Sequence, residues 1–319
     1  MIMEALPKII CILGVTAAGK SNLALALAKK FNGEIISADS RQIYKELDIG
    51  TAKPTGHWLT VGQQRIYMVG TVSHHIIDFV DPKEDFTLSD YKILAIQKID
   101  NVLSRGKIPF LVGGTALYLK AVLENWGLPQ VPPDLVLRHK LEHQNSLLLY
   151  NELKQKDPEG ASITGPHNKR RIIRALEVIY RTAKKFSEQR KKGPVLFDTL
   201  KLGLTVPKTE LETKIINRTN NMIKSGLIGE VRRLSQYHAW NSPAMQSIGY
   251  HEFKDFFENK INLVKVQELI TKNTLSYTRR QMTWFKKDKT INWVPADPKL
   301  ALAQATSLVK DFLTAKQIF

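Results

Sequence analysis

Cysteine is nearly absent from this chain, because Cys11 is the only one among 319 residues. A single cysteine excludes a disulfide within the chain and a zinc site built from a cysteine cluster. Long apolar runs are also missing, and none approaches the roughly 18 residues of a membrane-spanning helix. No basic segment followed by an apolar signal core precedes the apolar run at residues 9–13. We therefore expect a cytoplasmic protein without a membrane partner.

Acidic residues are scarce relative to basic ones, 30 against 47, which leaves a net charge of +17. A polyanionic partner would explain this excess, with nucleic acid first and an anionic membrane surface second. Between residues 165 and 194, ten basic residues are opposed only by Glu177 and Glu188. A second basic cluster includes aromatic residues and comprises Arg279, Arg280, Trp284, Phe285, Lys286, Lys287 and Lys289. Such a mixture suits phosphate contact with base stacking, although each run alone could be a solvated helix face.

The N-terminal part alternates strand patterns with helix patterns. The expected strands are residues 8–13, 34–37, 74–80 and 108–112, and the expected helices are residues 19–30, 89–105 and 115–124. Ser89 is the expected N-terminal cap of the second helix, with Asp90 in its first turn. This alternation predicts an α/β fold with a parallel sheet covered by helices on both faces.

The pattern changes after residue 127. Residues 128–134 are proline-rich and resemble a linker, and residues 135–192 show helix patterns only. A strand at residues 201–206 then returns to the sheet, and the remainder is helical apart from a late strand near residues 291–294. We expect an α/β core interrupted by a helical, basic insertion. The core comprises residues 1–127 and 200–319, and the insertion comprises residues 128–199.

The sequence GVTAAGKS follows the first strand and fits the phosphate-loop pattern, which most often holds ATP or GTP. Its glycines let successive N–H groups turn toward phosphate oxygens, and the following helix adds its positive end. A lysine adds a full charge, and the serine hydroxyl can ligate Mg²⁺. The predicted phosphate-binding residues are Gly14, Thr16, Ala17, Ala18, Gly19, Lys20 and Ser21, and Ser21 is the predicted Mg²⁺ ligand.

The carboxylate that usually accompanies a hydrolytic phosphate loop is missing from the expected position. Such NTPases carry a second apolar strand that ends in an aspartate. Here the candidate strand, at residues 108–112, is followed by two glycines and Thr115. Asp39 and Asp78 are the remaining carboxylates at strand ends. This arrangement favours a substrate whose diphosphate is bound for recognition or is released as a leaving group.

Eight motifs, in order, resemble the tRNA dimethylallyltransferases, also called tRNA isopentenyltransferases, over nearly the whole chain. They are GVTAAGKS, IISADSRQIYKELDIGTAKPT, HHIIDFVDP, FLVGGTALYLKAVL, DPEGA, RRIIRALEV, MQSIGYHE and TRRQMTWFK. The resemblance implies a phosphate-loop core similar to nucleotide kinases. It also implies transfer of a dimethylallyl group from dimethylallyl diphosphate to N6 of the adenine beside the tRNA anticodon. Diphosphate leaves, and Mg²⁺ assists.

The resemblance also implies roles for individual residues. Asp39 is expected to accept the proton of the adenine amine, and Thr115 to donate to the bridging oxygen of the diphosphate. The family places an arginine at the diphosphate. The aligned position carries Lys214, and Arg218 lies one turn later, so we rank the two equally. As alternatives, Asp39 could ligate Mg²⁺ or cap a helix, and Thr115 could cap a helix.

Contacts with the tRNA anticodon loop are expected, by resemblance, in four segments of the chain. The expected contact residues are Asp39, Ser40, Arg41, Gln42, Arg170, Arg171, Arg174, Gln246, Gly249, Tyr250, Arg279, Arg280, Gln281, Trp284 and Lys286. We expect a monomer.

Three other functions compete with this interpretation. An adenylate isopentenyltransferase acting on free AMP, ADP or ATP would not need the basic insertion. A phosphate-loop metabolite kinase would leave the DSRQIY and RRQMTWF sequences unexplained. A non-catalytic RNA-binding protein would leave the phosphate loop and Asp39 unexplained.

Overall fold

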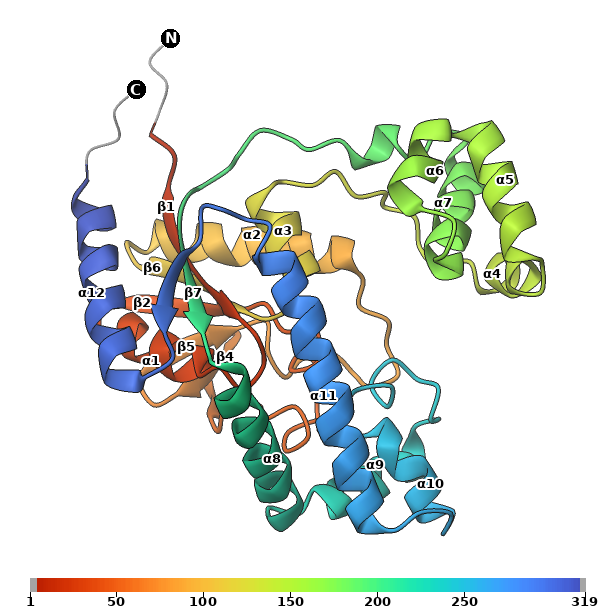
Figure 1. Cartoon of the computed structure of the whole chain (residues 1–319). Helices are drawn as coiled ribbons and strands as arrows, with labels where there is room; N and C mark the ends of the chain where they lie inside the picture. Colours follow the sequence, from red (N-terminus) through yellow and green to blue (C-terminus); the bar gives the residue numbers. More distant parts are fainter. Residues whose placement is uncertain (1–4, 316–319) are drawn as a thin grey trace. The chain divides into compact units, whose positions relative to one another are not determined.

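The computed structural model describes residues 5–315, which contain one eight-stranded sheet (Figure 1). The strands are β1 (Lys8–Gly14), β2 (Gly33–Ser37), β3 (His57–Val61), β4 (Gln64–Val69), β5 (Val72–His75), β6 (Ile108–Gly113), β7 (Asp198–Thr205) and β8 (Asn292–Pro295). Their order across the sheet is β3-β4-β5-β2-β6-β1-β7-β8.

The part of the sheet from β5 to β8 is parallel, which confirms the predicted α/β class. Ile10 of β1 lies between Phe110 of β6 and Leu200 of β7. Because β1 and β6 are buried along nearly their whole length, they are almost continuously apolar, whereas the equally buried β2 also carries Glu34 and Ser37. The carboxyl ends of these strands meet at one edge of the sheet, where polar side chains follow them.

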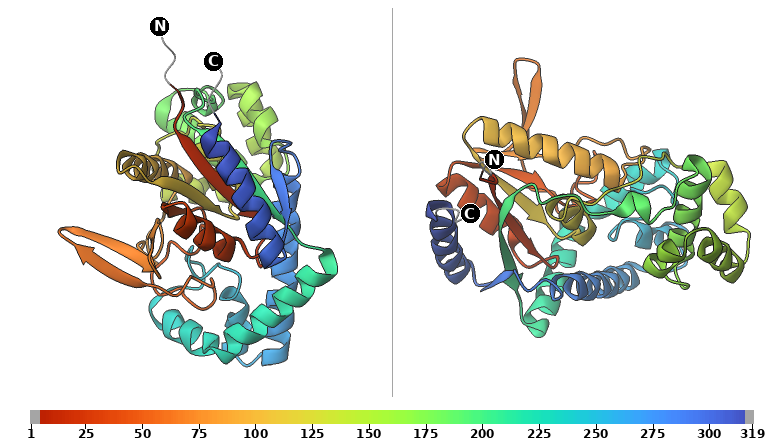
Figure 2. Two further views of the ribbon diagram at one scale, coloured as in Figure 1. Left: turned by 90° about the vertical axis from the view of Figure 1, so that its left-hand side faces the viewer. Right: turned by 90° about the horizontal axis from the view of Figure 1, so that it is seen from above.

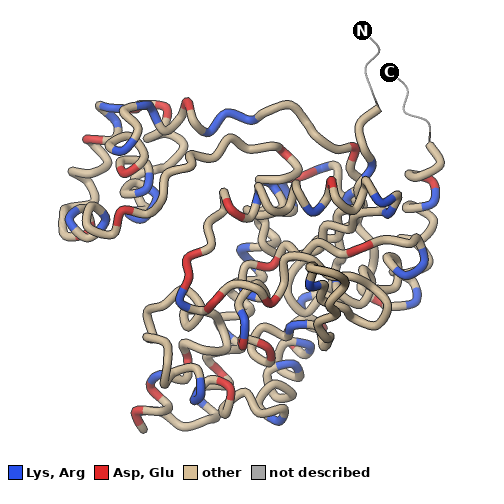
Figure 3. Tube along the Cα trace, turned by 180° about the vertical axis from the view of Figure 1, so that it is seen from behind, with Lys and Arg blue, Asp and Glu red and all other residues tan. Residues whose placement is uncertain are grey.

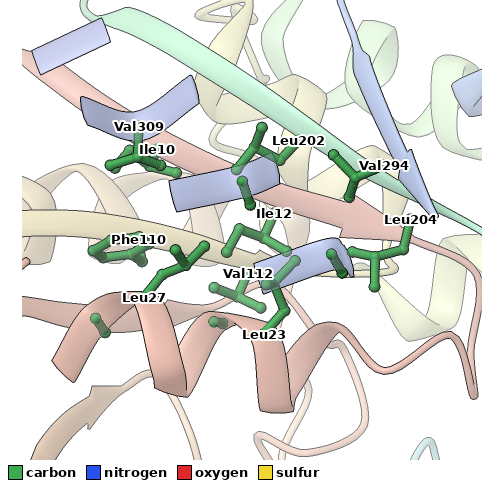
Figure 4. Packing of buried hydrophobic residues seen from close by; sticks show 14 of the residues in the cluster. Ile10, Ile12, Leu23, Leu27, Phe110, Val112, Leu202, Leu204, Val294 and Val309 are labelled. Atoms are coloured by element: carbon green, nitrogen blue, oxygen red, sulfur yellow. The ribbon is translucent and has the colours of Figure 1, made fainter. Parts of the chain in front are cut away.

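Two helices cover one face of the sheet, α1 (Lys20–Lys30) and α12 (Pro298–Thr314). Leu23 and Leu27 of α1 and Val309 of α12 pack with Ile10 and Ile12 in the main core (Figure 4). Residues alternate across a strand, so Ile36 and Leu111 point to the opposite face. There α2 (Leu88–Ser104) packs against β2 and β6.

The N-terminal cap of α2 differs from the expectation. Thr87 caps the helix instead of Ser89, because its side chain accepts a hydrogen bond from the Asp90 amide. The Asp90 carboxylate in turn accepts from the Thr87 amide at 2.9 Å, which completes a capping box. Asp90 lies in the first turn, as predicted.

The strand expected at residues 74–80 is shorter and lies earlier, because β5 ends at His75. Ile76 and Asp78 adopt positive φ values of 59° and 53°, which an extended strand does not accommodate. An unexpected feature is the β3–β4 hairpin, which projects from the sheet (Figure 2). Gly62, with a φ of 61°, begins its two-residue turn.

Helices after β7 extend this part of the chain. They are α8 (Lys208–Lys224), α9 (Leu227–Tyr237), α10 (Lys254–Phe257) and α11 (Leu263–Phe285), and α8 packs against α11. Glu230 of α9 is buried, and its carboxylate accepts hydrogen bonds from the amides of Asp48, Ile49 and Gly50. Tyr250 donates a fourth at 2.6 Å. This carboxylate therefore holds the loop that follows β2.

The chain divides into two compact units, one ending at Leu119 and resuming at Leu196, the other spanning Lys120–Val195. The helix α3 (Ala116–Leu123) crosses the first boundary. The second unit contains α4 (Leu135–Glu142), α5 (Ser146–Lys156), α6 (Pro158–Thr164) and α7 (Lys169–Thr182). Basic residues occur along both units (Figure 3). Within residues 5–315, no helix is long and apolar enough to cross a membrane.

The DPEGA motif organises the interior of the second unit. Asp157 caps α6 by accepting from the Gly160 amide at 2.9 Å, and it also accepts from the Ser187 amide and hydroxyl. Gly160 must be a glycine here, because a Cβ would lie 2.3 Å from the Asp157 carboxylate. This motif therefore stabilises the unit from within.

Candidate functional site

The phosphate loop connects β1 to α1 through three residues with positive φ. Gly14, Ala17 and Gly19 have φ values of 149°, 62° and 93°. A Cβ at Gly14 would lie 3.3 Å from the Leu204 carbonyl oxygen of β7, so the neighbouring strand also favours glycine there. Among residues 5–315, no side chain caps the start of α1 at Gly19, so the first amides of that helix remain available to an anion.

A cavity of about 440 Å³ lies at this loop, within the first unit. The loop contributes Thr16, Ala17, Gly19, Lys20 and Ser21 to its lining. The expected phosphate-binding residues Gly14 and Ala18 are not part of the lining: Gly14 ends β1, and Ala18 is buried in the main core.

Lys20 is the cation of the loop. Its ammonium donates to the Val15 carbonyl oxygen at 2.7 Å. Burial lowers the pKa of Lys20 to about 8, although the negative charge of Asp39 acts in the opposite direction. Lys20 is therefore protonated at neutral pH and needs an anion to compensate its buried charge.

Asp39 follows β2 and lines the same cavity. Its Oδ1 atom accepts hydrogen bonds from the amides of Arg41 at 2.9 Å and Gln42 at 3.3 Å. These bonds make a local turn that fixes the carboxylate at the carboxyl end of the sheet. The second expected carboxylate, Asp78, is not in the lining, because it pairs with Lys53 at 2.6 Å and accepts from Trp58.

Arg218 and Lys214 of α8 both line the cavity. Arg218 donates to the Thr51 carbonyl oxygen at 3.3 Å. Burial lowers its pKa, and the charge of Asp39 partly opposes this shift. Lys214 instead forms an ion pair with Glu210 at 2.6 Å. The geometry therefore favours Arg218 over Lys214 as the cation that faces a bound anion.

Thr115 lies beside the cavity and is not part of its lining. Its hydroxyl oxygen accepts from the Ser40 amide at 3.1 Å. The preceding glycines allow close approach: a Cβ at Gly113 would lie 2.1 Å from the Ala38 carbonyl oxygen. Thr115 is thus attached to the segment that carries Asp39.

Some of the residues expected to contact RNA are exposed, and others form hydrogen bonds or ion pairs within the protein. Arg170, Arg171, Gln246, Arg279, Arg280 and Lys286 are exposed, and Asp39, Ser40, Gln42 and Trp284 are partly exposed. Arg174 is engaged within its unit, where it pairs with the buried carboxylate of Glu177 and donates to Val131. Arg41 donates to the Pro243 carbonyl oxygen at 2.7 Å.

Three further residues expected to contact RNA are buried in this structure. Gly249 has a φ of 93° and donates its amide to Glu252. Tyr250 is fully buried against Gly50 and bonds Glu230. Gln281 is only 4% exposed. Their packing inside the first unit gives all three a structural role in this conformation.

Several cavity residues were not found by sequence reasoning, among them Asn217 and Asn221. They share one face of α8 with Lys214 and Arg218, at spacings of three and four residues. That polar stripe was a signal available in the sequence. Ala52 also lines the cavity, but nothing in its type marks it as a site residue.

Comparisons with known proteins agree on one family. The family model described as IPP transferase matches residues 42–288. The tRNA dimethylallyltransferase of Roseiflexus sp. (strain RS-1) is 43% identical over 313 residues, covering 96% of this chain and 99% of the relative. That of Microcystis aeruginosa (strain NIES-843 / IAM M-2473) is 40% identical, covering 93% of this chain and 90% of the relative.

Solved structures that resemble this chain belong to the same family. The tRNA isopentenylpyrophosphate transferase of Bacillus halodurans has a TM-score of 0.69 at 32% identity, covering 96% of this chain and 97% of that chain. A eukaryotic dimethylallyltransferase acting on tRNA has a TM-score of 0.79 at 29% identity, covering 98% of this chain and 81% of that chain. This chain therefore belongs to the family of tRNA dimethylallyltransferases, the IPP transferases.

Proposed function

We propose that this protein transfers a dimethylallyl group from dimethylallyl diphosphate to N6 of the adenine adjacent to the anticodon in tRNA. The observation that carries the proposal is a single cavity lined by the phosphate loop, Arg218 and Asp39. The first two suit a diphosphate, and the third suits a proton acceptor. The tRNA acceptor is supported by the relatives, which are tRNA dimethylallyltransferases, and by the net charge of +17.

In the proposed reaction the adenine N6 lone pair forms a bond to C1 of the dimethylallyl group as the C1–O bond breaks. The bonding electrons leave with diphosphate, whose growing charge is stabilised by the loop amides, Lys20 and Arg218. N6 loses a proton to the Asp39 carboxylate. This proton acceptor is needed because the amine lone pair is delocalised into the ring, which makes N6 a poor nucleophile. Thr115 is assigned to the bridging oxygen of the diphosphate by resemblance.

A magnesium ion fits this site if the diphosphate supplies most of its ligands. The Ser21 hydroxyl lines the cavity and would hold the ion. Within the part of the chain that the structure describes, no group of three or more acidic, histidine or cysteine side chains could form a metal cage. Mg²⁺ commonly binds through few protein ligands together with substrate phosphates. It would neutralise charge on the leaving group.

The helical insertion, residues 128–199, is proposed to be a tRNA-binding domain. Arg170 and Arg171 at the start of α7 are exposed, and their charges suit phosphates of the substrate. The exposed Arg279 and Arg280 on α11 are proposed to contribute from the core. Loop nucleotides can be splayed out at low cost, which lets the target adenine reach an enclosed site.

A transfer assay with labelled dimethylallyl diphosphate and Mg²⁺ tests the proposal. Unmodified tRNA, AMP and ATP would be offered in separate reactions. Label in tRNA alone supports the proposal. Label in free nucleotide alone would assign the chain to adenylate prenylation instead, and label in none of them would contradict any prenyl transfer to adenine by this cavity.

A further inference from the structure

One side-chain amide joins the phosphate loop to the turn after β6. Gln281 lies on α11 and is 4% exposed. Its Nε2 atom donates to the Gly114 carbonyl oxygen at 2.8 Å, and its Oε1 atom accepts from the Thr16 amide at 3.0 Å. Both hydrogen-bonding ends of the amide are thus used by backbone groups of the site.

The glycine at position 114 makes room for this amide. A Cβ there would lie 2.3 Å from Gln281 Nε2, far inside contact distance. One helical turn earlier, Tyr277 lies beside Thr115: burial raises the pKa of Tyr277, and the Thr115 hydroxyl acts more weakly in the opposite direction. Since residues four apart share a helix face, one face of α11 contacts two consecutive residues of the turn.

The bond to Thr16 also changes which amides can bind an anion. The Thr16 N–H is taken by Gln281, and the Ala18 N–H is taken by the Val15 carbonyl oxygen at 3.3 Å. The cradle for a phosphate must therefore come from the other loop amides and the start of α1. The hydrogen bond to Gln281 restrains the backbone of the loop at Thr16, which itself lines the cavity.

We propose that Gln281 is a positioning residue for the diphosphate. It fixes the phosphate loop through Thr16 and the Gly113–Thr115 turn through Gly114, and it does not contact RNA itself. The inference rests on the proposed function, because it assumes that the cavity takes the diphosphate of the prenyl donor.

The test measures binding of dimethylallyl diphosphate with Mg²⁺ by calorimetry in the absence of tRNA. Gln281→Glu keeps an acceptor for Thr16 but sets a carboxylate oxygen against the Gly114 carbonyl. Binding should weaken about tenfold, the usual scale for one lost hydrogen bond made worse by an unpaired acceptor. Lowering the pH should restore much of the loss relative to the unaltered protein, because a protonated glutamate can again donate to Gly114.

Two further variants keep the test decisive. Gly114→Ala displaces the amide from the other side and should weaken donor binding similarly, even if Gln281→Glu fails to fold. Gln267→Glu is the matched control, because Gln267 is also on α11 but bonds Asn220 at 3.2 Å. It should leave donor binding unchanged.

The outcomes separate this inference from the proposed function. If the unaltered protein binds the donor and Gln281→Glu binds it equally well but loses tRNA affinity, Gln281 contacts RNA and the inference is overturned. If the unaltered protein does not bind the donor, the proposed function fails, and the inference falls with it. Weaker donor binding with tRNA affinity retained supports the inference.

Discussion

At the scale of single residues, Asp39 and Asp78 show how identical groups acquire different roles. Both follow strands, but Asp78 is compensated by Lys53 and Trp58, whereas Asp39 lines the cavity. Replacing Asp39 by Asn keeps an oxygen for the Arg41 and Gln42 amides and removes the proton acceptor. We expect kcat to fall about 10²–10⁴-fold while donor binding is retained.

Steady-state kinetics and donor calorimetry on Asp39→Asn check this prediction. Asp78→Asn is the matched control, and it should lower thermal stability by weakening the ion pair with Lys53 while the folded enzyme keeps its kcat. A near-normal kcat for Asp39→Asn would remove the general-base assignment.

The two cationic residues of α8 that line the cavity allow a second prediction. Arg218 can offer two parallel donors to a phosphate, and Lys214 is already paired with Glu210. We expect Arg218→Lys to lower kcat/KM for the donor about tenfold or more, and Lys214→Gln to lower it much less. The opposite ranking in the same assay would assign the diphosphate contact to Lys214.

Lys20 predicts a pH dependence of donor binding. Its pKa is lowered to about 8 by burial, and a bound diphosphate should raise it by pairing with the charge. Affinity should therefore be highest below about pH 8 and should weaken as the pH rises above it. Calorimetry from pH 7 to higher values checks this, and Lys20→Arg, which stays charged, should remove that dependence. Equal slopes for both proteins would exclude Lys20 as the titrating group.

At the scale of elements, the loop after β2 depends on one buried carboxylate. Glu230 accepts three loop amides and the Tyr250 hydroxyl, so Glu230→Gln would direct an NH₂ group at donors. We expect unfolding free energy to fall by about 2–3 kcal/mol. Donor affinity should also fall, because this loop supplies Ala52 to the cavity and the Thr51 oxygen to Arg218.

Urea denaturation measures this change, and Glu258→Gln provides the comparison. Glu258 is an exposed glutamate paired with Lys260, so its replacement should change stability little. Equal effects for the two variants would show that the buried network does not stabilise the loop.

Elements whose local pattern agrees with their packing were predictable from the sequence. For the apolar runs of β1 and β6 and for the phosphate loop, the local sequence favours the same conformation that the fold contains. The end of β5 was not predictable, because it depends on a left-handed conformation at Ile76, which a β-branched residue rarely adopts. The β3–β4 hairpin was detectable from Gly62 at its turn.

The candidate site was predictable in its residue types but not in its exposure. Sequence alone could indicate the i,i+4 pair of Lys214 with Glu210 but not the contact of Arg218 with Thr51, so it could not rank the two cations. Nor could it show that Gln281 is buried, since its neighbours Arg279 and Arg280 are exposed. The contact of Arg218 with Thr51 and the contacts of Gln281 with Thr16 and Gly114 join distant segments, so only the fold reveals them.

At the scale of the whole molecule, the net charge of +17 predicts salt-dependent tRNA binding. Each lost phosphate contact should reduce the slope of log K against log salt by about 0.7–0.9. We expect such a reduction for Arg170→Gln and for Arg171→Gln. Arg65→Gln on the β4 strand, also an exposed arginine, should leave the slope unchanged. Unchanged slopes for all three variants would contradict an RNA-binding role for the start of α7.

The most direct test of the proposed prenyl transfer locates the product within the tRNA. Unmodified tRNA would be incubated with the protein, dimethylallyl diphosphate and Mg²⁺, then digested and analysed by mass spectrometry. We expect one dimethylallyl group on N6 of the adenosine beside the anticodon, and far less product with Asp39→Asn. Intact tRNA without a prenylated adenosine, from folded protein that binds both substrates, would contradict the proposed transfer.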